Sequence, residues 1–267
     1  MGKTYLRNFS QNLGLILQQA HEHPKGEEGY RADLNRIRAI EREAYRITPL
    51  NHYIHDALRK SKPVFGNPPS PCTFWVFSKA PKPEPYFDPA PPYLYVDVDF
   101  APEDLFTLGK DKKVIGELFI DLVEEALSKL KSIPGFPVDV IREGCEQFRK
   151  NDYTSSWKFG EKTIPGTKIK GRIDMEVTGA GTKRIFTLSY GRKTLIKQKI
   201  SEIDRPDVTR GRLFDDLVLD GDKILVKPKN WSWELQELGP KSYYKNAKID
   251  LTDYPEVLDL MSAKGWV

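Results

Sequence analysis

The chain has 267 residues, 39% of them hydrophobic, and a formal net charge of +4 at pH 7. That apolar content excludes a wholly disordered chain, and no apolar run approaches the roughly 18 to 20 residues that span a bilayer. Two cysteines, Cys72 and Cys145, and an N-terminus without a signal-peptide cleavage site are typical of a reducing compartment. We therefore expect a cytoplasmic protein that has no membrane partner.

Residues 1–62 are predicted to form an N-terminal helical layer. Apolar residues recur at three- and four-residue intervals in residues 4–20 and 30–46, which is the spacing of one helical face. We expect Pro49 to end the second of these helices and Asn51 to cap a short third one.

Residues 63–92 are rich in proline and interrupt the helical pattern. Ten of the twenty prolines of the chain lie in this segment. Proline fixes φ and lacks the amide donor, so such a density excludes a long helix or a central strand. We predict a proline-rich segment that wraps the surface, with a strand or edge strand at residues 72–78 (CTFWVFS).

Residues 93–267 are predicted to form an α+β core. Alternating apolar residues predict a strand at residues 93–100, and a wide apolar stripe predicts the best helix of the chain at residues 112–131. A further helix is expected at residues 138–150. The apolar period then changes to two, which predicts a three-stranded antiparallel meander over residues 167–200.

The C-terminal part of this core is less regular. A strand is predicted at residues 221–229 and a short helix or turn at residues 258–263. Together with the N-terminal helical layer and the proline-rich segment, these elements predict one structural unit of the α+β class, in which an antiparallel or mixed sheet is flanked by helices.

Basic residues gather on the predicted meander. Between residues 158 and 199 there are eleven Lys or Arg residues and only three acidic ones. Alternation places three of the basic residues on one face of the first strand and two on one face of the third. These candidate partner-binding residues are Lys168, Lys170, Arg172, Lys197 and Lys199.

This set of basic residues allows three interpretations. It can hold the phosphates of a nucleic acid, with Trp157, Phe159 and Tyr190 nearby to stack on bases. It can equally meet an acidic protein surface. The third interpretation is a solvated sheet face whose lysines discourage edge-to-edge aggregation.

Four aromatic residues toward the C-terminus are candidate anchors for a protein partner. They are Trp231, Trp233, Tyr243 and Tyr244. The Trp-Ser-Trp spacing puts both indole rings on one side of a strand, and aromatic side chains carry much of the binding energy of many interfaces. The alternative is ordinary packing in the core.

No motif of a common enzyme class occurs in the sequence. A glycine-rich loop followed by Lys-Ser/Thr and a Gly-x-Ser-x-Gly elbow are both missing. His52 and His55 have a spacing that fits one metal but no third ligand, and Cys145 lies on the apolar stripe of its predicted helix. We therefore expect no catalytic residue, no metal and no cofactor.

Paired carboxylates leave a metal-dependent enzyme as one alternative. Asp97 and Asp99 share one face of their predicted strand, and four aspartates cluster within residues 215–222. The competing interpretation is structural, because outward aspartates protect a strand edge and Asp220-Gly221-Asp222 is a turn signal.

The order of elements over residues 92–200 resembles that of small α+β immunity proteins from bacterial polymorphic-toxin and contact-dependent growth inhibition systems. The stretches that carry the resemblance are YLYVDVDF, the helix containing LFIDLVEEAL, GFPVDVI, EQFRKND and the strands after Lys168, which together span about 40% of the chain. The resemblance implies a non-enzymatic cytoplasmic protein that binds and neutralises a cognate toxin domain.

Two features depart from this resemblance. Many immunity proteins are acidic because many toxins are basic nucleases, whereas this chain has a net positive charge. The N-terminal helices and the proline-rich segment also lie outside the resembling part. The leading prediction is a protein-binding protein, and the alternative is a nucleic-acid-binding protein that uses the basic strands within residues 168–199.

Overall fold

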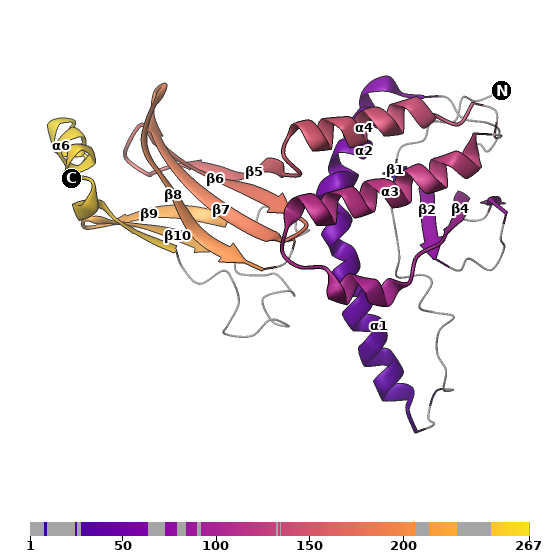
Figure 1. The fold of residues 1–267 in the computed structure, drawn as a ribbon. Coiled ribbons are helices and arrows are strands. Elements are labelled where there is room, and N and C mark those ends of the chain that lie inside the picture. Colours follow the sequence, from indigo (N-terminus) through magenta and orange to yellow (C-terminus); the bar gives the residue numbers. More distant parts are fainter. Residues whose placement is uncertain are drawn as a thin grey trace. The chain divides into compact units, whose positions relative to one another are not determined.

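The chain folds into two units. The residues described by the computed structural model are 8–9, 25, 28–63, 73–78, 84–89, 92–131, 133, 135–204, 206, 214–228 and 247–266. Unit 1 comprises residues 1–155 and 178–180, and unit 2 comprises residues 156–177 and 181–267. Helices accompany a mixed sheet in unit 1 and antiparallel strands in unit 2, so the predicted α+β class is confirmed (Figure 1).

The boundary between the units falls within the segment for which the sequence predicts a single α+β core. Each unit has its own hydrophobic cluster, one containing Phe119 and Cys145 and the other containing Phe186 and Leu217. The segments 1–62 and 63–92 both contribute to unit 1. Local apolar periodicity has the same form whether the apolar faces meet in one core or in two.

The helices of unit 1 largely follow the predicted pattern. Among the described residues they are α1 (Tyr30–Ala44), η2 (Tyr45–Ile47), α2 (Thr48–Ser61), η3 (Pro102–Thr107), α3 (Lys112–Leu130) and α4 (Val138–Lys150). The predicted helices at residues 30–46, 112–131 and 138–150 are confirmed. The Asp111 side chain caps α3 by accepting hydrogen bonds from the backbone N–H groups of its first turn.

The expected role of Pro49 is wrong. Helix α2 begins at Thr48, with Pro49 in its first turn, and Asn51 lies inside the helix instead of capping it. The N–H groups of the first helical turn have no intrahelical partner, so a proline there removes no hydrogen bond. The short 3₁₀ turn η2 joins α1 to α2, and the residues at its two ends, Ala44 and Thr48, both have right-handed helical backbone angles.

A mixed four-stranded sheet completes unit 1. Its strands are β1 (Asn8–Phe9), β2 (Thr73–Ser78), β3 (Tyr86–Pro89) and β4 (Pro92–Val98), in the order β1-β2-β4-β3. Strand β2 pairs in parallel with both β1 and β4, whereas β3 pairs antiparallel with β4.

This sheet corrects two expectations. Asn8 and Phe9 form a strand instead of the predicted helix, because their backbone pairs with Thr73 and Phe74. The remainder of the predicted helix at residues 4–20 lies outside the described residues. Strand β2 is confirmed, but it lies inside the sheet and is not an edge strand, since no proline falls within it to remove a ladder hydrogen bond.

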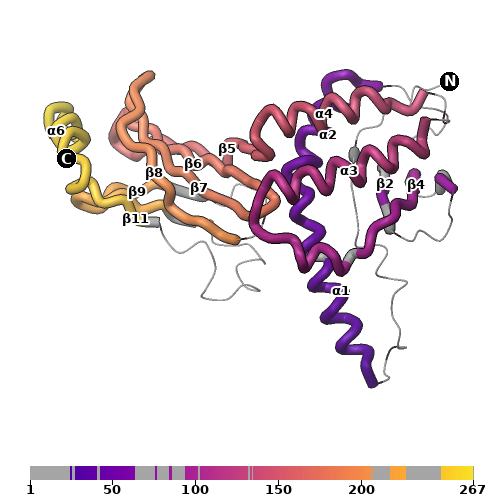
Figure 2. The backbone as a smooth tube through the Cα atoms, viewed as in Figure 1, coloured from indigo at the N-terminus to yellow at the C-terminus, as the bar shows by residue number. Residues whose placement is uncertain are grey.

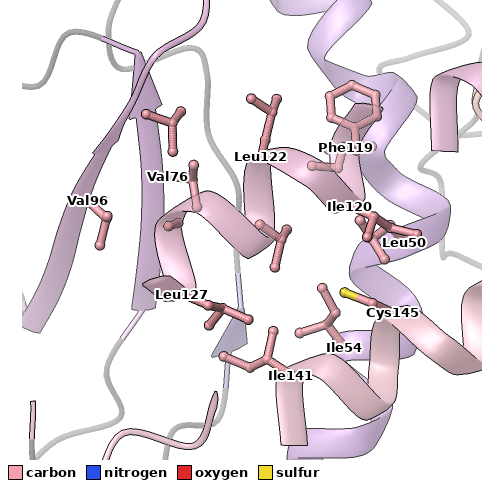
Figure 3. Close-up of a cluster of buried hydrophobic side chains, with 14 of the residues drawn as sticks. Leu50, Ile54, Val76, Val96, Phe119, Ile120, Leu122, Leu127, Ile141 and Cys145 are labelled. Atoms are coloured by element: carbon pink, nitrogen blue, oxygen red, sulfur yellow. The ribbon is translucent and has the colours of Figure 1, made fainter. Parts of the chain in front are cut away.

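The core of unit 1 is built where α2, α3 and α4 meet the sheet. Figure 3 shows apolar side chains of all three helices and of β2 and β4 in one cluster. Phe119 of α3 and Ile54 of α2 are fully buried. Gly144 lets α4 approach α2 closely, because a Cβ atom at Gly144 would lie 2.7 Å from the Cα atom of Ile54.

A buried arginine organises the end of unit 1 that holds η2 and η3. The Arg46 side chain is only 8% exposed. Its Nε donates to the carbonyl oxygen of Gly179 at 2.9 Å, and its two terminal nitrogens donate to the carbonyl oxygens of Leu105, Leu108 and Gly109. We call these four acceptors the carbonyl cage of Arg46. The only charged group bonded to Arg46 among the described residues is the Glu43 carboxylate, at 3.1 Å.

A second polar cluster ties α3 to the chain that follows α4. Two nitrogens of Arg149 bond both carboxylate oxygens of Glu117, with a shortest distance of 2.8 Å, and the Tyr153 hydroxyl donates to the same carboxylate. The bond to Arg149 lowers the pKa of Glu117, and the bond to Glu117 raises the pKa of Tyr153 to about 12. Gly116 leaves the space that the Tyr153 ring occupies.

The described residues of unit 2 form two antiparallel sheets and one helix. The first sheet has the order β5 (Ser155–Thr163), β6 (Ile169–Thr178), β7 (Gly181–Tyr190) and β8 (Lys193–Ile203). The second has the order β11 (Ala247–Asp250), β10 (Lys223–Pro228) and β9 (Phe214–Asp220). Helix α6 (Pro255–Ala263) follows. The predicted meander, the strand at residues 221–229 and the C-terminal helix are confirmed.

The two sheets of unit 2 pack through their apolar faces. A Cβ atom at Gly171 of β6 would lie 2.3 Å from a methyl group of Leu217 and 3.0 Å from the Phe186 ring. The Tyr254 hydroxyl, just before α6, donates to the side chain of Gln198 on β8 at 2.7 Å. In Figure 2, β6, β7 and β8 run as long neighbouring strands, with α6 near the C-terminus. One face of the first sheet is therefore covered and the other is exposed.

Strand β8 has two irregularities. Arg184 pairs with Ser201 and Ile185 pairs with Lys199, so Ile200 is an extra residue on β8. Leu195 is extra in the same way, between Thr194 and Ile196. Such bulges bend a strand and reset which side chains face inward.

None of the described helices combines the length and the apolar character that a membrane span requires.

Candidate partner-binding face

The five predicted basic residues lie on the exposed side of the first sheet of unit 2. All five are exposed. We call them the basic strand face: Lys168 in the turn before β6, Lys170 and Arg172 on β6, and Lys197 and Lys199 on β8. Along β6 these residues alternate with buried ones, as the period of two predicts.

Strand register shows that β6 and β8 present their basic residues on the same side. Lys197 lies opposite Thr187 of β7, and Lys199 lies opposite Ile185. Directly opposed residues of an antiparallel pair point to one face. The Ser189 hydroxyl oxygen, on β7, is 3.4 Å from the carbonyl oxygen of Lys170 on β6. Strand β7 therefore separates two rows of basic side chains.

Acidic neighbours neutralise part of this face. Arg172 pairs with Asp174 at 2.8 Å, and Lys199 pairs with Glu202. The hydrogen bond from Lys199 lowers the pKa of Glu202.

The remaining positive charge is concentrated on three lysines. Within the part of the chain that the structure describes, Lys168, Lys170 and Lys197 form no ion pair. Exposed ion pairs contribute little stability, so the Arg172 and Lys199 pairs can exchange partners at small cost. The face is thus cationic, with three ammonium groups available to an anionic partner.

The sequence predicts Asp174 on the same outward face as Arg172, whereas Glu202 was not predicted as a neighbour of Lys199. Asp174 lies two positions after Arg172 on β6, and this spacing on a strand is a readable sign of a shared face. Glu202 lies three positions after Lys199, which on a regular strand would be the opposite face. The bulge at Ile200 brings Glu202 and Lys199 to the same side.

The aromatic rings proposed to stack on bases are packed inside unit 2. Phe159 is only 6% exposed, and the Arg184 guanidinium lies 5.9 Å from its ring centre. Trp157 and Tyr190 are half-buried against the core, and the ring centroids of Tyr190 and Trp266 lie 5.5 Å apart in a T-shaped arrangement. The interpretation of Phe159 as a stacking platform is wrong, because its alternate position on β5 faces the core.

The four candidate anchors near the C-terminus lie outside the described residues. Trp231, Trp233, Tyr243 and Tyr244 therefore stay predictions.

Three of the residues considered for metal binding, His52, Asp220 and Asp222, have a structural environment that the described residues define. The Nδ1 atom of His52 lies 2.7 Å from the hydroxyl oxygen of Ser155. Asp220 and Asp222 flank a turn in which Gly221 has a φ of +59°, as the turn signal predicted. Across the described ranges, no three His, Cys, Asp or Glu side chains gather as a metal site would require.

Cys145 is a core residue. It is 1% exposed on the inner side of α4, and burial raises the pKa of its thiol from 9.0 to about 12. A thiol in this environment is neither a nucleophile nor a metal ligand at neutral pH. The expectation of a small buried residue is confirmed.

We expect Cys145 to resist alkylation in the folded protein. In a Cys72→Ser variant at pH 9, iodoacetamide should label Cys145 at least about a hundredfold more slowly than in urea-unfolded protein, because the folded thiol stays protonated and covered. Mass spectrometry measures both rates. The folded state keeps this proton to a higher pH than the unfolded state, so the thiol's contribution to stability declines as pH rises from 9 toward 12. Equal labelling rates in both states would contradict this burial.

Comparison of the chain with models of protein families, with curated proteins and with solved structures finds no match.

Proposed function

We propose that this chain is a non-enzymatic protein-binding protein that contacts an acidic partner through the basic strand face. One observation carries the proposal: basic side chains of two strands lie on the same exposed sheet face, and three of them have no ion pair among the described residues. Complementary charge of this kind steers a partner to its site and fixes its orientation.

The positions of the aromatic rings near the basic strand face bear on the choice between a protein partner and a nucleic acid. Proteins that hold single strands combine basic grooves with exposed aromatic rings on which the bases stack. Here the nearby rings of Phe159, Trp157 and Tyr190 pack against the core of unit 2. This arrangement favours carboxylates over stacked bases as the ligands of the face.

The resemblance to immunity proteins suggests which partner to test first. A cognate toxin domain with an acidic surface would fit both the resemblance and the positive charge of the face. Neutralisation would then require the face to cover the toxin's active site or its route to substrate.

The proposal predicts a partner whose binding depends on the lysines of the face. The tagged protein is used to capture partners from a native lysate, with and without nuclease. A Lys170→Glu/Lys197→Glu variant should lose a stoichiometric protein that the unmodified chain retains after nuclease treatment, because each substitution turns an attraction into a repulsion.

A matched variant controls for net charge. Lys131→Glu/Lys150→Glu makes the same change, from +4 to 0 because each substitution removes one positive and adds one negative charge, at exposed positions of unit 1. It should keep the partner. Equal capture by the two variants, or loss of every protein after nuclease, would contradict the proposed function.

A further inference from the structure

The exposed side of β7 differs from its two neighbours. Its outward residues are Lys183, which pairs with Glu202 at 3.9 Å, and then Ile185, Thr187 and Ser189, and we call these last three the β7 strip. They alternate with the buried residues Phe186 and Leu188. None of the three carries a charge, and all are shorter than a lysine or arginine side chain.

Long basic side chains border the β7 strip on both sides. Lys170 comes from β6, beside Ser189, and Lys197 comes from β8, opposite Thr187. Neighbouring strands are about 4.8 Å apart, so the two basic rows lie about 10 Å apart across β7, and the two-residue offset along the strands puts the two lysines about 12 Å from each other. Neither lysine forms an ion pair with another described residue.

The strip also offers a hydrogen-bonding group. Among the described residues, the Thr187 hydroxyl has no hydrogen-bond partner, and its side chain is half-buried between the two basic rows. A hydroxyl in this position can donate to a carboxylate or to a backbone carbonyl oxygen. The arrangement is linear and one strand wide, which is the width of an extended chain.

We propose that the β7 strip receives an extended acidic peptide segment of the partner, whose carboxylates pair with Lys170 on one side and Lys197 on the other. Successive side chains of an extended peptide point in opposite directions, so neighbouring glutamates or aspartates can reach the two basic rows. Charge repulsion keeps a run of such residues extended before binding. This inference rests on the proposed function and specifies the chemistry of the partner.

The test uses a fluorescently labelled peptide of ten glutamates and measures its binding by anisotropy at low salt. We expect binding to be at least about tenfold weaker for Lys170→Glu/Lys197→Glu and nearly unchanged for Lys131→Glu/Lys150→Glu. A peptide of alternating glutamine and serine should not bind.

A variant with a bulky side chain tests whether the peptide binds on the β7 strip or elsewhere on the sheet. Thr187→Tyr places a large ring between the basic rows and should weaken peptide binding at least about tenfold. Thr163→Tyr makes the same change at an exposed position of β5, which β6 separates from β7, and should have little effect. Circular dichroism verifies that both variants are folded.

Each result decides between stated alternatives. If Thr187→Tyr binds the peptide as well as the unmodified chain does, or if a ten-nucleotide oligothymidylate binds more tightly with the same dependence on the lysines, the inference is wrong. If the peptide fails to bind while partner capture still depends on Lys170 and Lys197, the proposed function stands and only the extended segment is refuted. If neither peptide binding nor partner capture depends on Lys170 and Lys197, the proposed function and this inference are both wrong.

Discussion

Replacing Arg46 by alanine is expected to lower the free energy of unfolding of unit 1 by about 3 to 5 kcal/mol. The substitution removes every donor that Arg46 supplies to the carbonyl cage and, among the described residues, leaves only the Leu105 oxygen with a backbone donor, Leu108 N–H at 3.4 Å. A buried carbonyl oxygen without a partner costs about 1 to 3 kcal/mol. The bonds to Gly179 and Leu105 are buried, and the others are partly buried. The Glu43 carboxylate loses its partner at a smaller cost, since it is already about one-third exposed.

Denaturant titration, followed by hydrogen exchange in peptides covering residues 102–130, measures this effect. Exchange is needed because two units need not unfold in one transition. Arg46→Lys should have an intermediate effect, since an ammonium cannot reproduce the planar fork of donors. Arg38→Ala, at an exposed position of α1, is the matched control and should be nearly neutral. A loss of under 1 kcal/mol for Arg46→Ala would show that water satisfies the carbonyl cage.

Gly144→Ala is expected to destabilise unit 1 by about 1 to 3 kcal/mol, although alanine is the better helix former. Intrinsic propensity favours alanine over glycine by about 1 kcal/mol inside a helix. The new methyl group, however, would lie 2.7 Å from Cα and 2.9 Å from the backbone nitrogen of Ile54. Backbone atoms cannot rotate aside as a flexible side chain can, so α2 and α4 must move apart and open their packed contact.

Thermal unfolding of paired variants measures the balance of these two effects. Gly109→Ala is the control, because no heavy atom lies within 4 Å of its added Cβ atom and the carbonyl group that Arg46 uses is retained. We expect a lower melting temperature for Gly144→Ala alone. If Gly144→Ala were instead stabilising, the close approach of α2 and α4 at Ile54 would be refuted.

Elements that depend on local periodicity were predictable. The apolar stripe of α3 and the period of two along β6 arise from residues within one element, so their spacing identifies the helix and the strand. Strand β1 was not predictable in this way. Asn8 and Phe9 are strand residues only because they pair with Thr73 and Phe74, which are far away in the sequence.

The residues of the basic strand face likewise include some that local periodicity predicts and some that depend on distant parts of the chain. Alternation along one strand is enough to place Lys170 and Arg172 on an exposed face. The pairing of Lys199 with Glu202 depends on the bulge at Ile200, and no local pattern in the sequence marks that bulge. The inward position of Phe159 likewise follows from packing against the rest of unit 2.

The position of Gly179 has a consequence for dividing the chain into fragments. Residues 178–180 belong to unit 1, although the chain on both sides of them belongs to unit 2. A fragment that stops at Ser155 lacks the acceptor for Arg46 Nε and the backbone that lies against Ile115. The complementary fragment, which begins at Ser156, contains residues 178–180 but lacks the residues of unit 1 that they contact. Each unit consists of two separate segments of the chain, so no single cut of the polypeptide yields both units complete.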